Sequence, residues 1–594
     1  ILHIDLTTSK ISKEAIPEIY AEQFLGGAGI NYRIAADVIR PEVEPLSPEN
    51  AIILGAGAFA GTRVPCASKL SVTTKFPVNG AIAAARAGGR FPMMLKSSGY
   101  DHVVITGAAM IPVYIKICSD EVSLEDARGL WRKDIFETAS LLSRQYRPCS
   151  TISIGPAGEN RVSISLAYVD LNGHLGSGGL GAVMGSKNLK AIVACRGNRP
   201  VTVADADGLH QLAGGILDRM KRSSQLSAIS RGGSVVTNMV QWLEEPRILG
   251  GGVRAQFPDA REKAAIRAFV DKYKETYRPM GCPRCLSPCK GGIEVESGEY
   301  AGTVCFGNFF APFPGGGDIY GRTLKYFADL NRYGICVFEF SSLLHLTSFL
   351  QEHGLVQENE VGFRVTTDDL EVALRLIEMT AYRRGFGDIL AGGVREFIRR
   401  VPQASDHAAH IKGRSIPFMN GWTWDPRVRG LGNMEFTQMT NPRGAHLSTS
   451  GAGTPQPGLS LQEIGACAKR IGISEEAIPR VLNEAGVSIA RLNRYTEDWV
   501  SLLDCAGICA QPFIETFYGV EMISELYKAL SGRDVGSPDM MRIAERSWNL
   551  WRLLNVKQGF SRKDDYPPGT WYTPLKSASR ELALHDYHDT RILN

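Results

Sequence analysis

Short apolar and β-branched runs alternate with polar turns that contain glycine or proline through the first 200 residues. Such runs predict strands, because strand side chains alternate between two faces and β-branched residues pack well there. The predicted strands cover residues 51–54, 69–74, 102–105, 113–117, 151–154 and 191–193, and residues 1–6 also fit a strand. Few long helical patterns interrupt them, so we expect a β-dominated first domain over residues 1–200.

Beyond residue 200 the apolar positions recur every three or four residues, which is the period of a helix that buries one face. Helices are predicted at residues 204–223, 264–274, 321–353, 474–484 and 539–554, and another after the capping residues 366–369. Residues 250–258 and 451–458 are predicted loops because glycine and proline are frequent there. The sequence therefore predicts an α+β protein, with two mainly helical domains at residues 201–408 and 409–594.

The composition is that of a globular protein with little excess charge. Hydrophobic residues make up 44% and charged residues 22% of 594 residues, and the net charge is +4. Because no block of Lys and Arg stands out, nucleic acid and anionic membranes are poor candidates as partners. No apolar run has the length of a membrane span, and residues 1–6 do not resemble a secretion signal. We expect a cytoplasmic protein whose twelve cysteines are reduced, mostly buried thiols plus a metal site.

Glycine-rich segments are the first indication of a ligand. The chain has 63 glycines, and residues 176–187 begin with the spacing G-x-G-x-x-G. A dinucleotide site would need a crossover helix after this loop and an acidic residue about twenty positions on. The next predicted strand follows too soon, and the first acidic residue is Asp205. The loop is therefore either a tight turn or a backbone cradle for a phosphate. Residues 24–29 and 87–89 are similar, and together the three segments favour a large, flat cofactor.

Cys282, Cys285 and Cys289 form a C-x2-C-x3-C run among prolines and glycines. The prolines and glycines prevent a regular helix and leave a loop that can point backbone N–H groups at thiolate sulfurs. The spacing favours an iron–sulfur cluster, which needs a fourth cysteine from elsewhere. Zinc is an alternative, although it usually takes paired C-x-x-C halves and no second one is present. Plain buried or redox-active thiols are the other alternative. The favoured interpretation is an electron-transfer enzyme.

A second cysteine motif, DCAGIC, occupies residues 504–509. Here the chain resembles the tungsten-containing aldehyde:ferredoxin oxidoreductases, in which a D-x-x-G-L-C motif supplies the last cluster cysteine. The other matching segments are residues 25–29 (LGG-x-G), 96–101 (K-x-AGYD), 155–160 (G-x-AGEN), 179–192 (GLGAVMGSKNLKAI), 412–413 with 425–427 (KG…DPR), 443–446 (RGACH) and 549–565 (NLxRxxN…RxDD). The resemblance runs almost end to end.

The resemblance implies a set of cofactors and the residues that hold them. Tungsten would be held by the dithiolene sulfurs of two pyranopterins, beside a [4Fe–4S] cluster, with Mg²⁺ bridging the pterin phosphates. The first domain would form a β-rich saddle for the pterins, and the two helical domains would cover it. The cluster ligands would be Cys282, Cys285, Cys289 and Cys509. The cofactor-binding residues would be Lys69, Arg86, Gly88, Gly178, Gly179, Asn331, Gly334, Cys336, Asp504 and Gly507.

Three positions bear on the reaction. Asn331 stands where the family's first D-x-x-G motif has a carboxylate, and its amide can still bind a pterin edge without bringing charge. Cys305 replaces a carboxylate of the aldehyde oxidoreductases and resembles a tungsten-coordinating cysteine of class II benzoyl-CoA reductases, a small buried hydrophobe being the alternative. His446 is retained as in the aldehyde oxidoreductases, and its imidazole can act as general acid or base at neutral pH.

Two activities fit these residues. In the favoured one an aldehyde is oxidised to a carboxylic acid, His446 handles a proton, and electrons leave singly through the cluster to ferredoxin or an iron–sulfur partner subunit. In the other, a low-potential site that includes Cys305 reduces an aryl-CoA or acyl-CoA. A non-catalytic iron–sulfur scaffold is a third hypothesis, which the intact match at residues 179–192 argues against. We also expect an oligomer or a larger complex.

Overall fold

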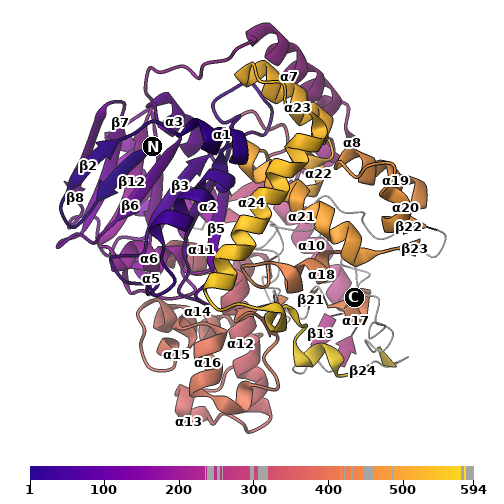
Figure 1. Ribbon diagram of the computed structural model, residues 1–594. Coiled ribbons are helices and arrows are strands. Elements are labelled where there is room, and N and C mark those ends of the chain that lie inside the picture. Colours follow the sequence, from indigo (N-terminus) through magenta and orange to yellow (C-terminus); the bar gives the residue numbers. More distant parts are fainter. Residues whose placement is uncertain are drawn as a thin grey trace.

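Two six-stranded mixed sheets form the N-terminal part of the molecule (Figure 1). The computed structural model describes residues 1–234, 236, 247–249, 254–256, 259–294, 300–304, 319–416, 418–419, 422–423, 425–429, 433–446, 460–483, 486–576 and 581–582. The first sheet has the order β2-β1-β6-β3-β4-β5 and the second β11-β10-β9-β12-β7-β8. The strands are β1 (Leu2–Asp5), β2 (Lys10–Lys13), β3 (Ile52–Ala56), β4 (Lys69–Lys75), β5 (Ile82–Gly88), β6 (His102–Thr106), β7 (Val113–Cys118), β8 (Glu121–Asp126), β9 (Cys149–Ile154), β10 (Ala167–Val169), β11 (Gly173–Leu175) and β12 (Leu189–Cys195). Every strand predicted from the first 200 residues is present, so the β-rich N-terminal region is confirmed.

Short helices join these strands, and the sequence pattern did not predict them. They are α1 (Glu18–Phe24), α2 (Gly27–Val38), α3 (Phe91–Ser97), α4 (Ile135–Gln145), α5 (Pro156–Glu159) and α6 (Leu180–Ser186). The glycines of residues 24–29 do not form a simple turn, because Gly27 begins α2. A Cβ at Gly27 would lie 2.3 Å from the carbonyl oxygen of Asp504, so the small residue allows a distant segment to approach.

The rest of the chain is mainly helical, as predicted. Its helices are α7 (Ala206–Lys221), α8 (Ser224–Ser230), α10 (Ala260–Thr276), α11 (Ile319–Tyr333), α12 (Val337–Glu352), α13 (Glu358–Val361), α14 (Leu370–Ala381), α15 (Gly387–Ala391), α16 (Val394–Arg400), α17 (Pro426–Arg429), α18 (Asn433–Thr440), α19 (Leu461–Arg470), α20 (Ile478–Val481), α21 (Ile489–Ala506), α22 (Pro512–Glu515), α23 (Val520–Ser531) and α24 (Ser537–Lys557). The strands are β13 (Arg247–Leu249), β14 (Arg254–Gln256), β15 (Arg278–Met280), β16 (Lys290–Glu294), β17 (Tyr300–Val304), β18 (His410–Ile411), β19 (Arg414–Ser415), β20 (Phe418–Met419), β21 (Trp422–Thr423), β22 (Leu482–Asn483), β23 (Gly486–Val487), β24 (Leu575–Lys576) and β25 (Glu581–Leu582).

Three predicted segments in this region are corrected. The helix expected over residues 321–353 is two helices, because Gly334 has φ +78° and ends α11 before Cys336 begins α12. The helix expected at residues 474–484 is only α20, since Pro479 is tolerated only in the first turn of a helix. Within the predicted loop 250–258, residues 254–256 are strand β14. The predicted loop 451–458 lies outside the described residues.

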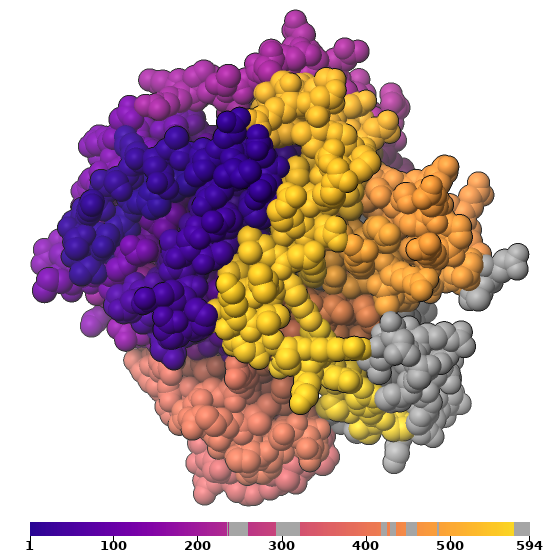
Figure 2. Space-filling view, in the orientation of Figure 1, coloured from indigo at the N-terminus to yellow at the C-terminus, as the bar shows by residue number. Residues whose placement is uncertain are grey.

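Helix α24 joins the two halves of the molecule. It packs on α2 and on β5, and it runs in yellow alongside the indigo N-terminal elements (Figures 1 and 2). Tyr32 of α2 stacks on Trp551 of α24 with ring centroids 5.3 Å apart. The Trp551 indole donates a hydrogen bond to the carbonyl oxygen of Ile82, at 2.8 Å, so the end of the first sheet is fixed against a segment distant in sequence.

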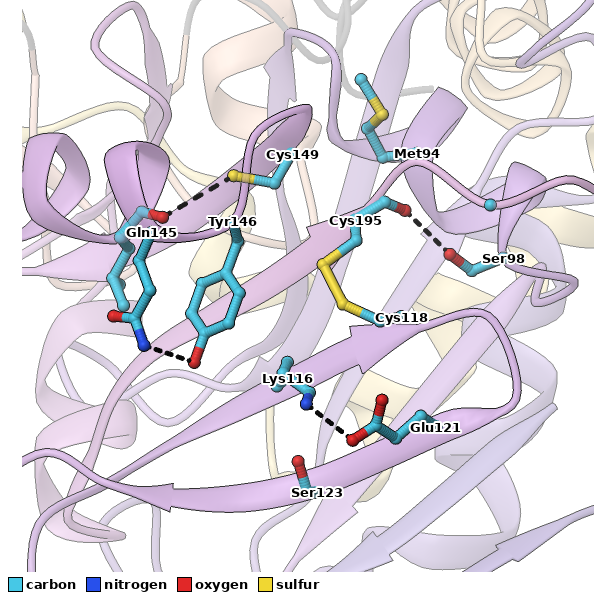
Figure 3. Close-up of a disulfide and its surroundings, with 12 residues drawn as sticks. Met94, Ser98, Lys116, Cys118, Glu121, Ser123, Gln145, Tyr146, Cys149 and Cys195 are labelled. Atoms are coloured by element: carbon cyan, nitrogen blue, oxygen red, sulfur yellow. Dashed lines mark hydrogen bonds and ion pairs between the residues drawn. A yellow bond between two sulfur atoms is a disulfide. The ribbon is translucent and has the colours of Figure 1, made fainter.

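One pair of cysteines departs from the expectation of free thiols. Cys118 and Cys195, on the neighbouring strands β7 and β12, form a disulfide at the end of the second sheet (Figure 3). The other described cysteines are free. In the described part of the chain, no helix is long and apolar enough to cross a membrane.

Candidate metal and cofactor centre

One cavity brings together seven of the predicted site residues. Its volume is about 180 Å³. Its wall includes Cys282, Cys285, Cys289, Cys509, Lys69, Gly88 and His446, together with the unpredicted residues Cys66, Ser177, Lys290 and Arg414. These residues come from both halves of the chain, so the cavity exists only once the N-terminal sheets and the C-terminal helices have packed together.

The cysteine nest is an irregular loop between β15 and β16, as its prolines and glycines predicted. The backbone N–H of Cys285 donates to the carbonyl oxygen of Cys282 at 3.2 Å, which closes a turn. The hydroxyl of Ser234 donates to the carbonyl oxygen of Cys289 at 2.9 Å. The Tyr277 hydroxyl bonds the carbonyl oxygen of Pro288. Backbone groups of the loop are therefore satisfied by its surroundings, and the thiols are left to face the cavity.

The fourth predicted cluster cysteine reaches the nest from the end of α21. Gly507, with φ +79°, ends that helix, and Cys509 follows two residues later. The carbonyl oxygen of Gly507 accepts a hydrogen bond from the backbone N–H of Lys69 at 3.0 Å, so the start of β4 is fixed to the same motif. Among the described residues, no three His, Cys, Asp or Glu side chains are close enough to hold a single metal ion. A [4Fe–4S] cluster binds each of its cysteines to a different iron.

Gly88 is a position where a side chain would not fit. A Cβ there would lie 2.4 Å from the Cys282 sulfur and 3.8 Å from the Lys69 ammonium nitrogen. Close approach of the sheet backbone to the nest therefore depends on glycine. Lys69 itself is surrounded by Cys509, Cys282, Cys289 and Asp504, whose negative charges raise its pKa although burial acts against them.

Buried guanidinium groups gather beside the cavity. Arg86 forms an ion pair with Asp504 at 2.9 Å, and Arg414 forms one with Glu339 at 3.0 Å. Arg443 has carbonyl partners instead, including those of Ala84 at 2.9 Å and Gly176 at 3.0 Å. Three guanidinium groups are thus accompanied by only two carboxylates. Burial raises the pKa of Asp504 to about 6 despite the opposing effect of Arg86.

Some of these nitrogens have no hydrogen-bond partner in the described part of the chain, namely Arg86 Nε and Nη1 and Arg443 Nε. Buried donors without a partner are costly, and guanidinium groups suit phosphate oxygens. Orphaned donors, an excess of positive charge and a glycine-edged cavity therefore fit a large cofactor that carries phosphates.

His446 lines the same cavity and is half-buried. Burial lowers the pKa of His446 well below its usual value, and the charges of Arg443, Arg414 and Arg86 lower it further. The imidazole is therefore neutral at pH 7 and can accept a proton from a group in the cavity.

Asn331, Gly334 and Cys336 lie outside the residues that line the cavity. The Asn331 amide oxygen accepts a hydrogen bond from the Tyr168 hydroxyl, which also contacts His174. Cys336 is buried, and burial raises the pKa of its thiol. The contact of these three residues with a pterin stays a prediction.

Gly178 and Gly179 have φ angles of +137° and +98°. Cβ atoms there would lie 2.9 Å from the Phe76 ring and 2.5 Å from Pro77. Of the two interpretations of this loop, these contacts support the tight turn with close packing. Its cavity-facing residue is Ser177, whose carbonyl oxygen accepts hydrogen bonds from Arg414 and Arg443.

Comparison with known proteins identifies the family. Residues 1–196 match the family described as "Aldehyde ferredoxin oxidoreductase, N-terminal domain", and residues 215–591 match "Aldehyde ferredoxin oxidoreductase, domains 2 & 3". The chain belongs to the aldehyde ferredoxin oxidoreductase family. It is similar to the tungsten-containing aldehyde ferredoxin oxidoreductase of Pyrococcus abyssi, with 31% identity over 97% of this chain and 91% of that protein.

The chain is also similar to two proteins that are not named as aldehyde oxidoreductases. The WOR-like subunit of an aliphatic sulfonate oxidoreductase from Pyrococcus furiosus is 25% identical over 97% of this chain and 90% of its own length. A chain of the active-site complex BamBC of benzoyl coenzyme A reductase matches with a TM-score of 0.84 at 24% identity, covering 96% of this chain and 90% of that chain. The similarity to this BamBC chain shows that the two chains share a fold.

Membership of the aldehyde ferredoxin oxidoreductase family implies a tungstopterin and a [4Fe–4S] cluster, and the cavity fits both groups. The sequence analysis missed Cys66, Ser177, Arg414 and Arg443 as candidate site residues. Arg443 was within reach, because it begins the Arg-Gly-Ala-His segment that contains His446. Ser177 could also have been found, because it lies in the glycine-rich segment 176–187, whereas Cys66 and Arg414 lie in no segment whose residue types suggested chemistry. Cys305, predicted as a tungsten ligand, lies outside the described residues.

Proposed function

We propose that this protein oxidises an aldehyde to a carboxylic acid. The observation that carries the proposal is a single cavity lined both by the cysteines Cys282, Cys285, Cys289 and Cys509 and by a neutral histidine, His446. The reaction consumes one aldehyde and one water, and it yields one carboxylic acid, two protons and two electrons. It therefore requires a proton acceptor close to a path for single electrons.

The cofactors would be held by residues from both halves of the chain. When bound, the tungstopterin supplies the two-electron redox chemistry. Arg86 and Arg443 would bind its phosphates through their orphaned nitrogens, with Mg²⁺ bridging those phosphates. Lys69 would lie between the cluster cysteines and Asp504, and its charge would balance the negative thiolates. Gly88 would allow the sheet to approach the cluster.

His446 would accept a proton released as the aldehyde is hydrated and oxidised. Three neighbouring guanidinium charges disfavour the imidazolium, so the proton would not stay on His446 and could pass on to solvent. Positioned acid–base catalysis of this kind contributes typically about 10²–10⁴-fold to a rate.

Electrons would leave one at a time through the cluster. The acceptor in the family is ferredoxin, and we propose ferredoxin or an iron–sulfur partner subunit here. A cytoplasmic location and an oligomeric assembly belong to the same proposal.

Reduction of an aryl-CoA or acyl-CoA is the second candidate. It is favoured by the shared fold with a benzoyl coenzyme A reductase chain and by Cys305, which replaces a carboxylate expected of aldehyde oxidoreductases. The distinguishing residue is His446, which lines the cavity and favours aldehyde oxidation. A non-catalytic scaffold is disfavoured by the buried guanidinium nitrogens of Arg86 and Arg443 that have no hydrogen-bond partner in the described part of the chain.

The test uses protein purified without oxygen and assayed for viologen and ferredoxin reduction with a panel of aldehydes, and for reduction of aryl-CoA substrates. We expect aldehyde-dependent reduction that falls about 10²–10⁴-fold in His446→Ala at unchanged tungsten and iron content. His407→Ala is the matched control, because His407 packs on Phe349 and does not line the cavity. Activity with an aryl-CoA and with no aldehyde, together with loss of a tungsten–sulfur contact in Cys305→Ser by X-ray absorption, would replace this proposal with the second one.

A further inference from the structure

Two segments that match the family, residues 412–413 and 549–565, contribute no residue to the cavity wall. The fold brings them together around one carboxylate. The Lys412 ammonium lies 2.6 Å from the Asp565 carboxylate, and Arg552 Nη1 lies 3.2 Å from it. The Lys412 side chain is 1% exposed. Two cations thus share one acid, and a buried ion pair of this kind gains little net stability, because removal of the charges from water opposes their attraction.

Both cations also bond the carboxyl end of α18. Arg552 Nη1 donates to the carbonyl oxygen of Thr440 at 2.7 Å, and the Lys412 ammonium donates to the carbonyl oxygen of Met439. The last four carbonyl groups of a helix have no partner within the helix, and positive charge is favourable at that end. Lys412 and Arg552 therefore satisfy two carbonyl groups where α18 ends, and Asp565 holds both cationic side chains in place.

The end of α18 leads directly into the turn at residues 441–446, which contains His446. Bonds within the turn close it, because the N–H groups of Gly444 and Arg443 donate to the backbone and side-chain oxygens of Asn441, both at 3.0 Å. Gly444 has φ +88°, and a Cβ there would lie 2.7 Å from the carbonyl oxygen of Ile411, next to Lys412. The turn is therefore a compact unit whose place depends on the residues that anchor it.

Asn79 joins Lys412 to the same turn. Its side-chain amide donates to the carbonyl oxygen of Lys412 at 3.0 Å and to that of Arg443 at 3.1 Å. The last two residues of the turn, Ala445 and His446, line the cavity. A movement of Lys412 is therefore passed both to the end of α18 and to Arg443, and from there to the imidazole of His446.

We propose that Asp565 is a positioning residue for His446: through Lys412 and Arg552 it fixes the end of α18, and with it the turn that presents His446 to the cavity. The inference rests on the proposed function, in which His446 accepts the proton. Asp565 itself does not line the cavity, so it acts on the reaction only through the place of the imidazole. A displacement of about 1 Å of a catalytic group can cost about 10²-fold in rate.

The experiment measures kcat and KM for an aldehyde, per tungsten bound, after Asp565→Asn is introduced into wild type and into His446→Ala. In wild type we expect kcat to fall about 10- to 100-fold with little change in KM, because the imidazole acts in the transition state. In His446→Ala no further fall is expected, because no imidazole is left to misplace. Asp565→Glu keeps the charge and should recover part of the loss. Asp534→Asn is the matched control, because Asp534 pairs with Lys528 at the surface and lies outside the cavity.

A second readout does not depend on activity. Diethyl pyrocarbonate modifies neutral imidazole, and peptide mass spectrometry of the holoenzyme gives the rate of modification at His446 as a function of pH. Burial and the charges of Arg443, Arg414 and Arg86 lower the pKa of His446, so the midpoint should lie below pH 6.5 in wild type. In Asp565→Asn the displaced imidazole should lose part of these effects, and the midpoint should rise towards pH 6.5.

The outcomes separate this inference from the proposed function. Equal falls in kcat in the wild-type and His446→Ala backgrounds would show a merely structural role and overturn the inference, as would an unchanged midpoint for the modification of His446. A wild-type protein that oxidises no aldehyde refutes the proposed function, and the modification midpoint then still decides whether Asp565 positions His446. If Asp565→Asn does not fold, Arg552→Lys keeps the positive charge but not the planar group that reaches both Asp565 and Thr440, and the same pattern of losses is expected.

Discussion

Gly88→Ala is the sharpest test of how the N-terminal sheet meets the cysteine nest. The added Cβ would lie 2.4 Å from the Cys282 sulfur. Non-bonded heavy atoms need about 3.5–4.0 Å, so the sulfur would have to move by about 1 Å or more. Metal–thiolate distances tolerate changes of only about 0.2 Å, so the loop must move with the sulfur or the cysteine must leave the cluster. Overpacking of this kind costs typically about 1–3 kcal/mol, which corresponds to about 5- to 140-fold in an equilibrium constant.

The assay is the amount of iron and acid-labile sulfide per chain after anaerobic purification, together with the EPR spectrum of the reduced cluster. Gly129→Ala is the control, because a Cβ at Gly129 would have no neighbour within 4 Å. We expect the control to match wild type and Gly88→Ala to lose cluster, while circular dichroism shows both variants folded. Full iron content with a wild-type spectrum in Gly88→Ala would refute the contact between Gly88 and Cys282, and with it this placement of the nest.

Three further predictions address the proton, the core and the disulfide. Because the pKa of His446 is lowered, its neutral form persists below pH 6.5. The value of kcat/KM for an aldehyde should therefore stay level through pH 6.5 and fall only at lower pH. A fall centred at pH 6.5 or above would contradict this prediction. Lys190→Met leaves the carboxylate of Glu159 buried without its partner at 2.5 Å and should cost about 3–5 kcal/mol by thermal unfolding, with part of that loss recovered when Glu159→Gln is added. Burial already raises the pKa of Glu159, so the loss in Lys190→Met should be larger at pH 8 than at pH 5, and equal losses would argue against it. Replacing Cys118 and Cys195 with alanine removes a cross-link over 77 residues and should cost about 4 kcal/mol; two free thiols found in wild type under non-reducing conditions would remove the basis of the prediction.

Local sequence patterns were sufficient to predict the two N-terminal sheets and the irregular loop that holds the cysteines. Strands β4 and β12 contain short runs of β-branched residues, at positions 72–74 and 192–193, and such runs favour strands. The nest between Cys282 and Cys289 was predicted as irregular for a similarly local reason, since its prolines and glycines act on their own backbone. The single helix expected over residues 321–353 failed because apolar periodicity continues through Gly334, whose positive φ is set by packing against Ile135 and Leu166.

The cavity could be predicted only in part, because its wall is assembled over long distances in sequence. The residues with recognisable motifs, such as Cys509 and His446, were found. Arg414 carries no signal in sequence, because its importance comes from Ser177 and Glu339, which approach it only in the folded chain. The same holds for Cys66, whose backbone partners Arg284 and Cys509 are more than two hundred positions away. A thiol becomes informative only when its neighbours are known.

The longest family match also shows why family membership leaves the substrate open. Within residues 179–192, Lys187 donates to the carbonyl oxygens of Pro48 and Gly107 at 2.9 Å, and Lys190 pairs with Glu159. Both lysines are fully buried, and burial lowers the pKa of Lys187 to about 8. The two buried lysines of the segment that identifies the family therefore serve packing, because they bond to Pro48, Gly107 and Glu159, none of which lines the cavity. Selection for this fold can keep the segment constant while the cavity wall changes, so relatives that oxidise different compounds would share it. Variants of His446 and Arg414, which line the cavity, and of Cys305, the predicted metal ligand, are therefore expected to report on the substrate better than variants of this segment.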